Sequence, residues 1–176
     1  CSASRASFLS GVRPNSTGVD YPYSNYFMNK FRPTHPMLAE YFEQNGYYAH
    51  TFGKIHHGGP SDNLKTVHYN PKTGLNTGKF YALPENIDKG GARGRSIETP
   101  PYESADVQDE AYVDGLIAQE AVKVISQQKE TKDPFFIAVG FNKPHLPFNA
   151  PKKYWDLYED SEMLLAPNQS HPENSP

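Results

Sequence analysis

The feature that most constrains the fold is a continuous apolar run at residues 135–141, with a turn signal on its N-terminal side at residues 131–134. A strand that is buried on both faces has such a run instead of an alternating pattern, and this is typical of parallel sheets. Residues 106–129, directly before it, have the periodicity of a long helix. The pair predicts an α/β fold in which residues 135–141 form a buried, central, parallel strand.

The predicted long helix has one apolar face. Apolar side chains recur along it with the i, i+3, i+4, i+7 spacing of a helix. They are Val113, Leu116, Ile117, Ala121, Val124 and Ile125. We expect this face to lie in the core and not against a partner. Because Gly115 costs roughly 1 kcal/mol relative to alanine inside a helix, we also expect another part of the chain to approach it closely.

A second helix and strand are predicted nearer the N-terminus. Residues 34–46 have an apolar stripe, a possible cap at Thr34 and a stop at Asn45-Gly46. The aromatic residues that follow, 47–52, predict a short strand. A helix, a glycine and a strand in this order form the repeating unit of an α/β sheet.

The regions outside these two units predict less regular structure. Residues 61–104 have little periodicity and several glycines, which indicates a long loop. Residues 151–158 predict a short amphipathic helix, and residues 161–176 a polar tail on the surface.

The single cysteine of the chain lies four residues before an arginine, in Cys1-Ser2-Ala3-Ser4-Arg5. Apolar residues follow, and Gly11 ends the pattern, which predicts a turn and then one or two helical turns. A helix N-terminus favours anions, and a guanidinium one turn further on offers a planar set of donors to an oxyanion. The stretch suggests a nucleophile facing a tetrahedral anion. The alternative is that Cys1 is a small buried hydrophobic residue, the more common role of a lone cysteine.

Both predicted strands lead into loops that carry lysine and histidine. Residues 47–52 run into Lys54, His56 and His57, and residues 135–141 into a loop with His145. The carboxyl ends of strands are where α/β folds place their sites. Lys54 supplies a fixed positive charge, and a histidine can protonate a leaving alkoxide. From the residues alone, a merely polar loop, adventitious metal binding by the histidine pair and a structural role for His145 all stay open.

Three motifs in order resemble the type I sulfatases, which depend on formylglycine. Residues 1–11 are similar to the active-site signature of that family. Residues 46–57 are similar to its second signature, with Gly53-Lys54 followed by a histidine. Residues 134–148, which include Lys143-Pro144-His145, are very similar to the iduronate-2-sulfatase-like branch.

The resemblance implies an alkaline-phosphatase-like α/β fold, with a central, mostly parallel sheet flanked by helices, and hydrolysis of a sulfate ester. In this family the cysteine is oxidised to formylglycine, whose diol attacks sulfur. Carried over, Cys1 is the precursor of the nucleophile and a ligand of Ca²⁺, and Arg5 holds the formylglycine and balances charge. Lys54, His57 and His145 bind the sulfate oxygens and help to protonate the leaving oxygen. The general family pattern would select His56 instead, but the ungapped match to the branch favours His57.

The resemblance also implies that residues 1–176 are part of a single catalytic domain that lacks its N-terminal strand and its C-terminal portion. Most Ca²⁺ ligands would then lie outside this chain, and we expect the isolated chain to bind Ca²⁺ weakly and not to turn over. The implied partners are a sulfated carbohydrate substrate and a formylglycine-generating maturation enzyme. The implied location is periplasmic, secreted or lysosomal.

Composition excludes some classes of function and leaves others. The formal net charge of -3 argues against a general nucleic-acid binder, and no apolar run reaches the length of a membrane span. Two alternatives to a sulfatase remain. An amidohydrolase with an N-terminal cysteine would use its own amine as base, which leaves both lysine motifs unexplained. A non-catalytic module that binds sulfated glycans would keep Cys1 unmodified.

Overall fold

The computed structural model describes residues 2–19, 36–55, 67–69, 80–90, 99–171 and 173, with only the backbone described at 67–69 and 88–90. Its main sheet has three described strands, β1 (Tyr48–Gly53), β2 (Val67–Tyr69) and β4 (Phe135–Gly140), in the order β2-β1-β4. All are parallel. The predicted α/β class and the parallel strands at 47–52 and 135–141 are thus confirmed.

The central position predicted for β4 is wrong for the described sheet. Here β1 has a neighbour on each side, whereas β4 pairs only with β1. Phe135 and Val139 are 40% and 37% exposed. A continuous apolar run indicates that both faces of a strand contact hydrophobic groups. It does not indicate whether the strand pairs with one neighbouring strand or with two.

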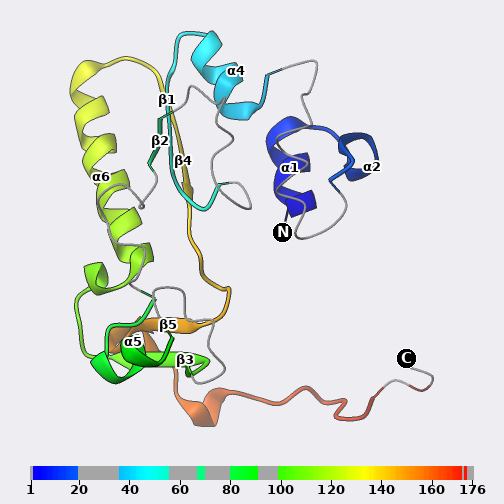
Figure 1. Ribbon diagram of the computed structural model, residues 1–176, viewed down its shortest axis with the longest axis vertical. Coiled ribbons are helices and arrows are strands. Elements are labelled where there is room, and N and C mark those ends of the chain that lie inside the picture. The colour runs from blue at the N-terminus through cyan, green and yellow to red at the C-terminus, as the bar shows by residue number, and fades with distance from the viewer. Residues whose placement is uncertain are drawn as a thin grey trace.

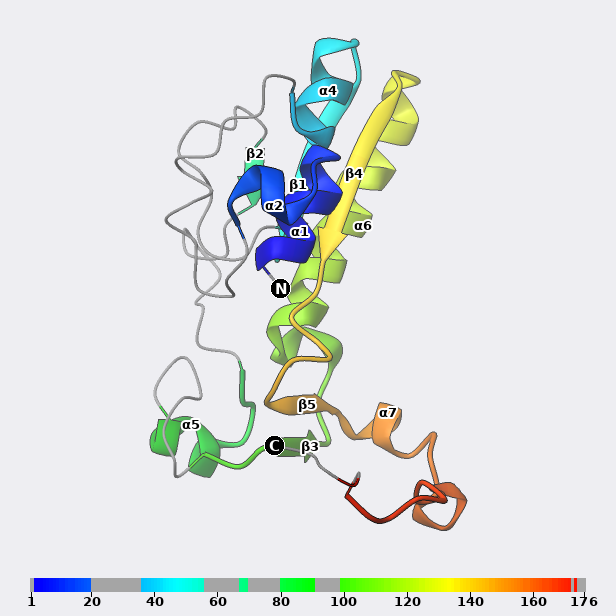
Figure 2. The ribbon, with the colours of Figure 1, turned by 90° about the vertical axis from the view of Figure 1, so that its right-hand side faces the viewer.

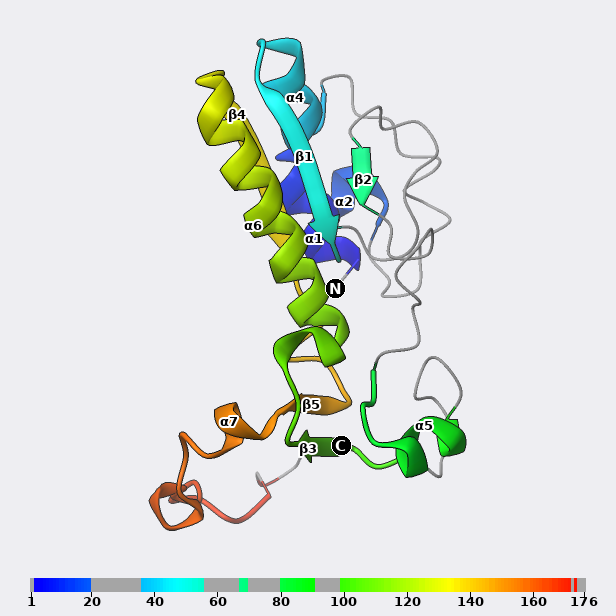
Figure 3. The same ribbon diagram turned by 90° about the vertical axis from the view of Figure 1, so that its left-hand side faces the viewer.

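Helices cover both faces of this sheet. Helix α6 (Val113–Thr131) lies on one face, and α1 (Ser2–Ser10), α2 (Pro14–Thr17) and α4 (Leu38–Gln44) lie on the other, as the three views together show (Figure 1, Figure 2, Figure 3). The core between α6 and the sheet contains Phe52, Val113, Ile117 and Ala121, with Phe80, Val124 and Ile137 packed against it. The prediction that the apolar face of the long helix is core is confirmed, although Ile125 at its margin is 41% exposed.

The long helix begins later than the sequence predicts. A single turn of 3-10 helix, η3 (Asp109–Ala111), precedes it, and the extended backbone of Tyr112 (φ -110°, ψ 154°) separates the two. The turn folds back onto Gly115, where a Cβ atom would overlap the carbonyl oxygen of Asp109. The expected close approach to Gly115 is therefore confirmed.

Helix α4 is shorter than predicted at its N-terminal end. Met37 is its N-cap, and the Glu40 carboxylate accepts a hydrogen bond of 3.0 Å from the Met37 amide. The predicted cap, Thr34, lies outside the described residues. The helix ends as expected before Gly46, whose φ is +83°, and the Phe42 ring stacks on Phe136 of β4 with centroids 4.4 Å apart.

A smaller layer lies beyond the carboxyl ends of the main strands (Figure 1). Strands β3 (Tyr102–Ala105) and β5 (Phe148–Pro151) pair in parallel, flanked by α5 (Pro84–Gly90) and the predicted short helix α7 (Lys152–Trp155). The prediction that residues 61–104 form a long loop is wrong where they are described, since β2, α5 and most of β3 lie there. The physical reason is that a buried carboxylate, and no apolar period, organises the later part of this segment.

That carboxylate belongs to Glu103, which is 3% exposed. It accepts hydrogen bonds from the amides of Ala82 (2.6 Å) and Leu83 (3.3 Å), from Asn86 Nδ2 (2.6 Å) and from the Tyr112 hydroxyl (2.8 Å). Burial, together with the hydrogen bond to this carboxylate and its charge, raises the pKa of Tyr112 well above its usual range. The phenol therefore stays a donor, and α5 and β3 are joined to the start of α6.

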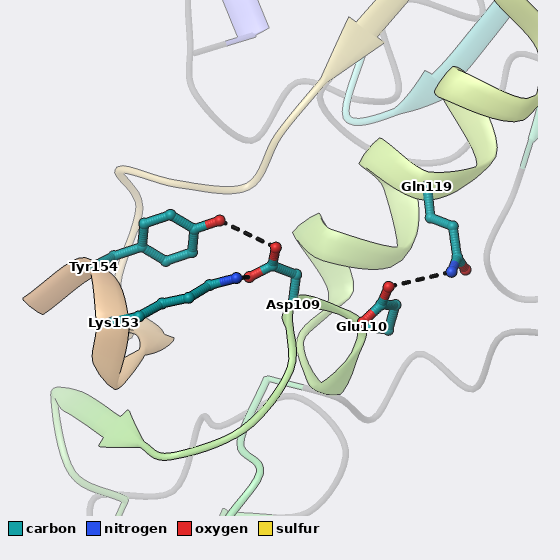
Figure 4. Close-up of polar contacts among 5 residues, drawn as sticks. All are labelled: Asp109, Glu110, Gln119, Lys153 and Tyr154. Carbon is teal, nitrogen blue, oxygen red and sulfur yellow. Dashed lines mark hydrogen bonds and ion pairs between the residues drawn. The ribbon is translucent and has the colours of Figure 1, made fainter.

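Surface contacts join the same region to α7 (Figure 4). The Asp109 carboxylate accepts from Lys153 Nζ at 2.8 Å and from the Tyr154 hydroxyl at 3.1 Å, while Gln119 donates to Glu110 at 3.2 Å. After α7 the chain continues through η4 (Asp160–Glu162) into an exposed tail, as predicted. Within the described segments, no helix combines the length and apolar character required to cross a membrane.

Candidate active site

The site is built where β1 and β4 end. Gly53 and Gly140 are partners in the parallel register, and Lys54 N donates to Gly140 O at 2.7 Å. A Cβ atom on Gly53 would overlap Gly140 O and lie 2.7 Å from Ile117 Cδ1, and one on Gly140 would overlap Lys54 O. The absence of side chains at both positions lets the two loops leave the sheet side by side, which is where an α/β fold places its ligands.

Helix α1 contributes Arg5 to this place. Its guanidinium Nη1 donates to the carbonyl oxygens of Lys54 and of Ile55, the latter at 3.0 Å. Ala6 and Leu9 of the same helix are buried. The helix ends at Gly11 as predicted; Gly11 has a φ of +70°, and its amide donates to Ser7 O at 2.8 Å. The first and second sequence motifs are thereby brought together.

Lys54 is partly buried next to this guanidinium. Burial first, and then the positive charge of Arg5, lower the pKa of Lys54, whereas the carboxylate of Asp114 opposes the change. Within the described part of the chain, no carboxylate lies within ion-pair distance of the Lys54 ammonium. An anion that approached Lys54 would relieve an unfavourable electrostatic environment.

The loop after β4 carries the third motif. His145 is exposed, its amide donates to Asn142 O at 3.0 Å, and its Nδ1 lies 2.6 Å from Leu146 O. The peptide bonds before Pro144 and Pro147 are both cis. Among the described residues, no hydrogen bond joins His145 to Arg5 or Lys54, so the structure brings its loop to this edge of the sheet without joining the side chain to the other two.

Two residues at this edge were not assigned a role from the sequence. Lys143 is half-buried, its Nζ lies 5.8 Å from the centroid of the Phe80 ring, and burial lowers its pKa while Asp114 opposes the change. Asp114, in the first turn of α6, accepts hydrogen bonds from the backbone of the loop. Lys143 lies within the third motif, whereas the sequence contains no signal for Asp114: the predicted helix begins at residue 106 and so places Asp114 in its interior, and its partner Asn142 is 28 residues away.

The remaining predicted site residues, Cys1, His56 and His57, lie outside the described residues. Within the described segments, no three side chains of the types His, Cys, Asp and Glu converge as metal ligands would. The described edge has the charges to bind an anion. Arg5 lies beside Lys54, and Lys54 and Lys143 both interact electrostatically with the carboxylate of Asp114, which already accepts hydrogen bonds from the loop.

Comparison of the sequence with known protein families identifies the family of the chain. The sulfatase family profile, described as "Sulfatase", matches residues 1–172. The chain belongs to the sulfatase family. This confirms the resemblance drawn from the three motifs and, with it, the alkaline-phosphatase-like fold class.

Individual sulfatases align over most or all of the chain. Iduronate 2-sulfatase of Mus musculus is 29% identical and that of Homo sapiens 30% identical, each over 100% of this chain and 32% of the relative. Choline-sulfatase of Rhizobium meliloti (strain 1021) is 29% identical over 93% of this chain and 33% of the relative. The chain thus spans about a third of the length of the curated relatives that it matches.

Proposed function

We propose that the protein hydrolyses sulfate esters of a sugar or glycan, with a formylglycine formed from Cys1 as the nucleophile. The observation that carries the proposal is the sulfatase match over residues 1–172, supported by the guanidinium of Arg5 on the backbone of the Lys54 loop. The first motif, which contains the candidate nucleophile, thereby meets the second, which contains the candidate sulfate-binding lysine.

The roles proposed for the described residues follow from charge. A sulfate ester is anionic, and attack at sulfur moves further negative charge onto the sulfate and leaving oxygens. Cationic groups that are already in place stabilise such charge without reorganising at the moment of reaction. In this scheme Arg5 holds the Lys54 loop, Lys54 contacts the sulfate oxygens, and His145 provides protons for the leaving oxygen. His57, which lies outside the described residues, is proposed to share the role of His145.

We propose Ca²⁺ binding only for the intact protein that contains this chain. It takes about 6 to 8 oxygen ligands, and the described residues do not fit this requirement, because no three metal-ligating side chains converge among them. Cys1, which the resemblance makes one ligand, lies outside them.

The proposed substrate class rests on the names of the relatives. Two of them are iduronate 2-sulfatases, and a third is a choline-sulfatase. The similarity to the first two along the whole chain supports a sulfated sugar. Processing by a formylglycine-generating enzyme and a periplasmic, secreted or lysosomal location are further parts of the proposal.

The proposal is tested with the intact protein that contains this chain, produced together with a formylglycine-generating enzyme. Mass spectrometry of the peptide with Cys1 should show the aldehyde, and sulfate should be released from a sulfated monosaccharide panel. Cys1→Ala is the matched control and should release none. An aldehyde without release of sulfate from any sugar, but with release from choline sulfate, would overturn the sugar assignment. A persistent thiol with sugar binding would favour the non-catalytic alternative.

A further inference from the structure

The carboxylate of Asp114 is almost fully engaged with the backbone of the loop after β4. Its Oδ1 accepts from the Asn142 amide at 2.9 Å and from Asn142 Nδ2 at 3.2 Å. Its Oδ2 accepts from the Lys143 amide at 2.9 Å and lies 3.1 Å from the Asn142 amide. A side chain 28 residues earlier in the sequence thus fixes the place where the third motif begins.

We propose that Asp114 is a positioning residue of the sulfatase site, which holds the loop with Lys143 and His145 in place beside the loop with Lys54. This inference rests on the proposed function. It assigns to Asp114 no contact with substrate; the residue acts through the backbone of Asn142 and Lys143.

The geometry supports a function beyond ordinary stabilisation of a helix end. An acidic residue in a first helical turn is stabilising by itself, but that effect requires no partner outside the helix. Here every hydrogen bond of the carboxylate described above goes to the loop, and Asn142 offers two donors, its amide and its side chain. Helix α6 packs on both β1 and β4, and Asp114 in its first turn lies near the ends of these strands. The helix therefore supports both loops.

Electrostatics at the site point the same way. The carboxylate of Asp114 opposes the lowering of the pKa of Lys54 and of Lys143 that burial produces. In the described segments it forms no ion pair with either ammonium within 4.0 Å. It therefore favours the charged form of both lysines and leaves their ammonium groups available to an anion.

The test compares Asp114→Asn with Asp109→Asn in the intact, matured protein. Asparagine keeps the size of the side chain, but its Nδ2 atom is a donor and must face an amide of Asn142 or Lys143. The turnover number is measured per formylglycine, counted by mass spectrometry, so that protein with an unconverted Cys1 does not enter the ratio. We expect Asp114→Asn to lower kcat about 10- to 100-fold with KM changed much less, and Asp114→Glu to recover part of the loss.

Asp109→Asn is the matched control, since Asp109 lies near the same end of α6 but bonds to Lys153 and Tyr154 on the surface (Figure 4). The kcat of Asp109→Asn should equal that of the matured wild-type protein. An Asp114→Asn variant with unchanged kcat per formylglycine would overturn the proposal.

Hydrogen exchange at the amides of Asn142 and Lys143 separates this inference from the proposed function, because it requires no activity. We expect faster exchange at both amides in Asp114→Asn and no change in Asp109→Asn. Unchanged exchange would overturn the role of Asp114 even in an active sulfatase. A fully modified wild-type protein that hydrolyses no sulfate ester would instead overturn the proposed function.

Discussion

Gly53 and Gly140 are register partners at the carboxyl ends of two neighbouring parallel strands, and neither position has room for a side chain. Gly53 also has a φ of +67°, a conformation that side chains disfavour. The Gly53 backbone lies against the carbonyl oxygen of Gly140, and the Gly140 backbone lies against that of Lys54. This pair therefore sets the spacing between the loop with Lys54 and the loop with His145.

The first prediction concerns this close approach. Gly53→Ala should lower the free energy of unfolding by about 1–3 kcal/mol from overpacking, in addition to the cost of a positive φ. Gly46→Ala is the control, because Gly46 also has a positive φ, +83°, but nothing lies within 4 Å of its would-be Cβ. Denaturant unfolding of both variants measures the difference. Equal losses would contradict a steric role for Gly53.

Much of the main layer was predictable because local patterns encode it. The apolar stripe of α6, the stops at Gly11 and Gly46 and the parallel strands β1 and β4 all follow from periodicity and backbone preference within a short window. The order of the strands and the start of α6 do not, since these depend on which backbone lies beside which. The segment around α5 and β3 was missed because its organising contact, Glu103, is polar and long-range.

The site shows the same division. Arg5, Lys54 and His145 were selected by motif, and the structure brings Arg5 to the Lys54 loop. Asp114 could not be recognised, because its partners, Asn142 and Lys143, are distant in sequence and are contacted mainly through backbone amides, which leave no residue-type signature. The catalytic roles predicted for Cys1, Arg5, Lys54, His57 and His145 stay predictions.

A second prediction concerns Arg5. Its Nη1 atom donates to two consecutive carbonyl oxygens. The ammonium of Arg5→Lys is on a side chain one bond shorter, and we expect it to lose at least one of the two bonds. Loss of one charge-assisted hydrogen bond costs about 1.5–3 kcal/mol. We expect faster amide exchange in residues 2–10 and a lower kcat/KM. Arg13→Lys, at an exposed arginine, is the control and should change neither, and equal behaviour of the two variants would contradict the prediction.

A third prediction concerns pH. Burial and Arg5 lower the pKa of Lys54 from 10.5, and Asp114 only partly opposes them. If the ammonium binds sulfate, activity is present below this lowered pKa and is lost as the pH rises through it, so the alkaline limb of kcat/KM lies below pH 10.5. Arginine stays charged there, so Lys54→Arg should move the limb to higher pH even if the maximum falls.

The controls for the pH profile are two other lysines. Lys153→Arg changes an exposed residue bonded to Asp109, whose contact raises the pKa of Lys153, and should leave the limb in place. Lys143 also has a lowered pKa. A limb that moves in Lys143→Arg and not in Lys54→Arg would assign the titration to Lys143 and contradict the prediction for Lys54.

The last prediction concerns the buried carboxylate that organises the smaller layer. Each oxygen of Glu103 accepts from one backbone amide, Oε1 from Ala82 and Oε2 from Leu83. In Glu103→Gln one oxygen becomes an NH₂ group, so whichever way the amide lies, a backbone donor faces another donor. An unsatisfied buried donor costs about 1–3 kcal/mol, and we expect a loss of that size in denaturant unfolding.

The matched control for that change is Glu110→Gln. Within the segments that the structure describes, the Glu110 carboxylate accepts one exposed hydrogen bond, of 3.2 Å, from Gln119 (Figure 4). The amide oxygen of the glutamine variant can still accept it. The same chemical substitution should therefore leave the unfolding midpoint unchanged. Because Glu103 joins α5 and β3 to the start of α6 through Asn86 and Tyr112, its variant should also exchange faster at the amides of residues 82–86. Similar midpoints for the two variants would show that the hydrogen bonds of Glu103 do not stabilise this layer.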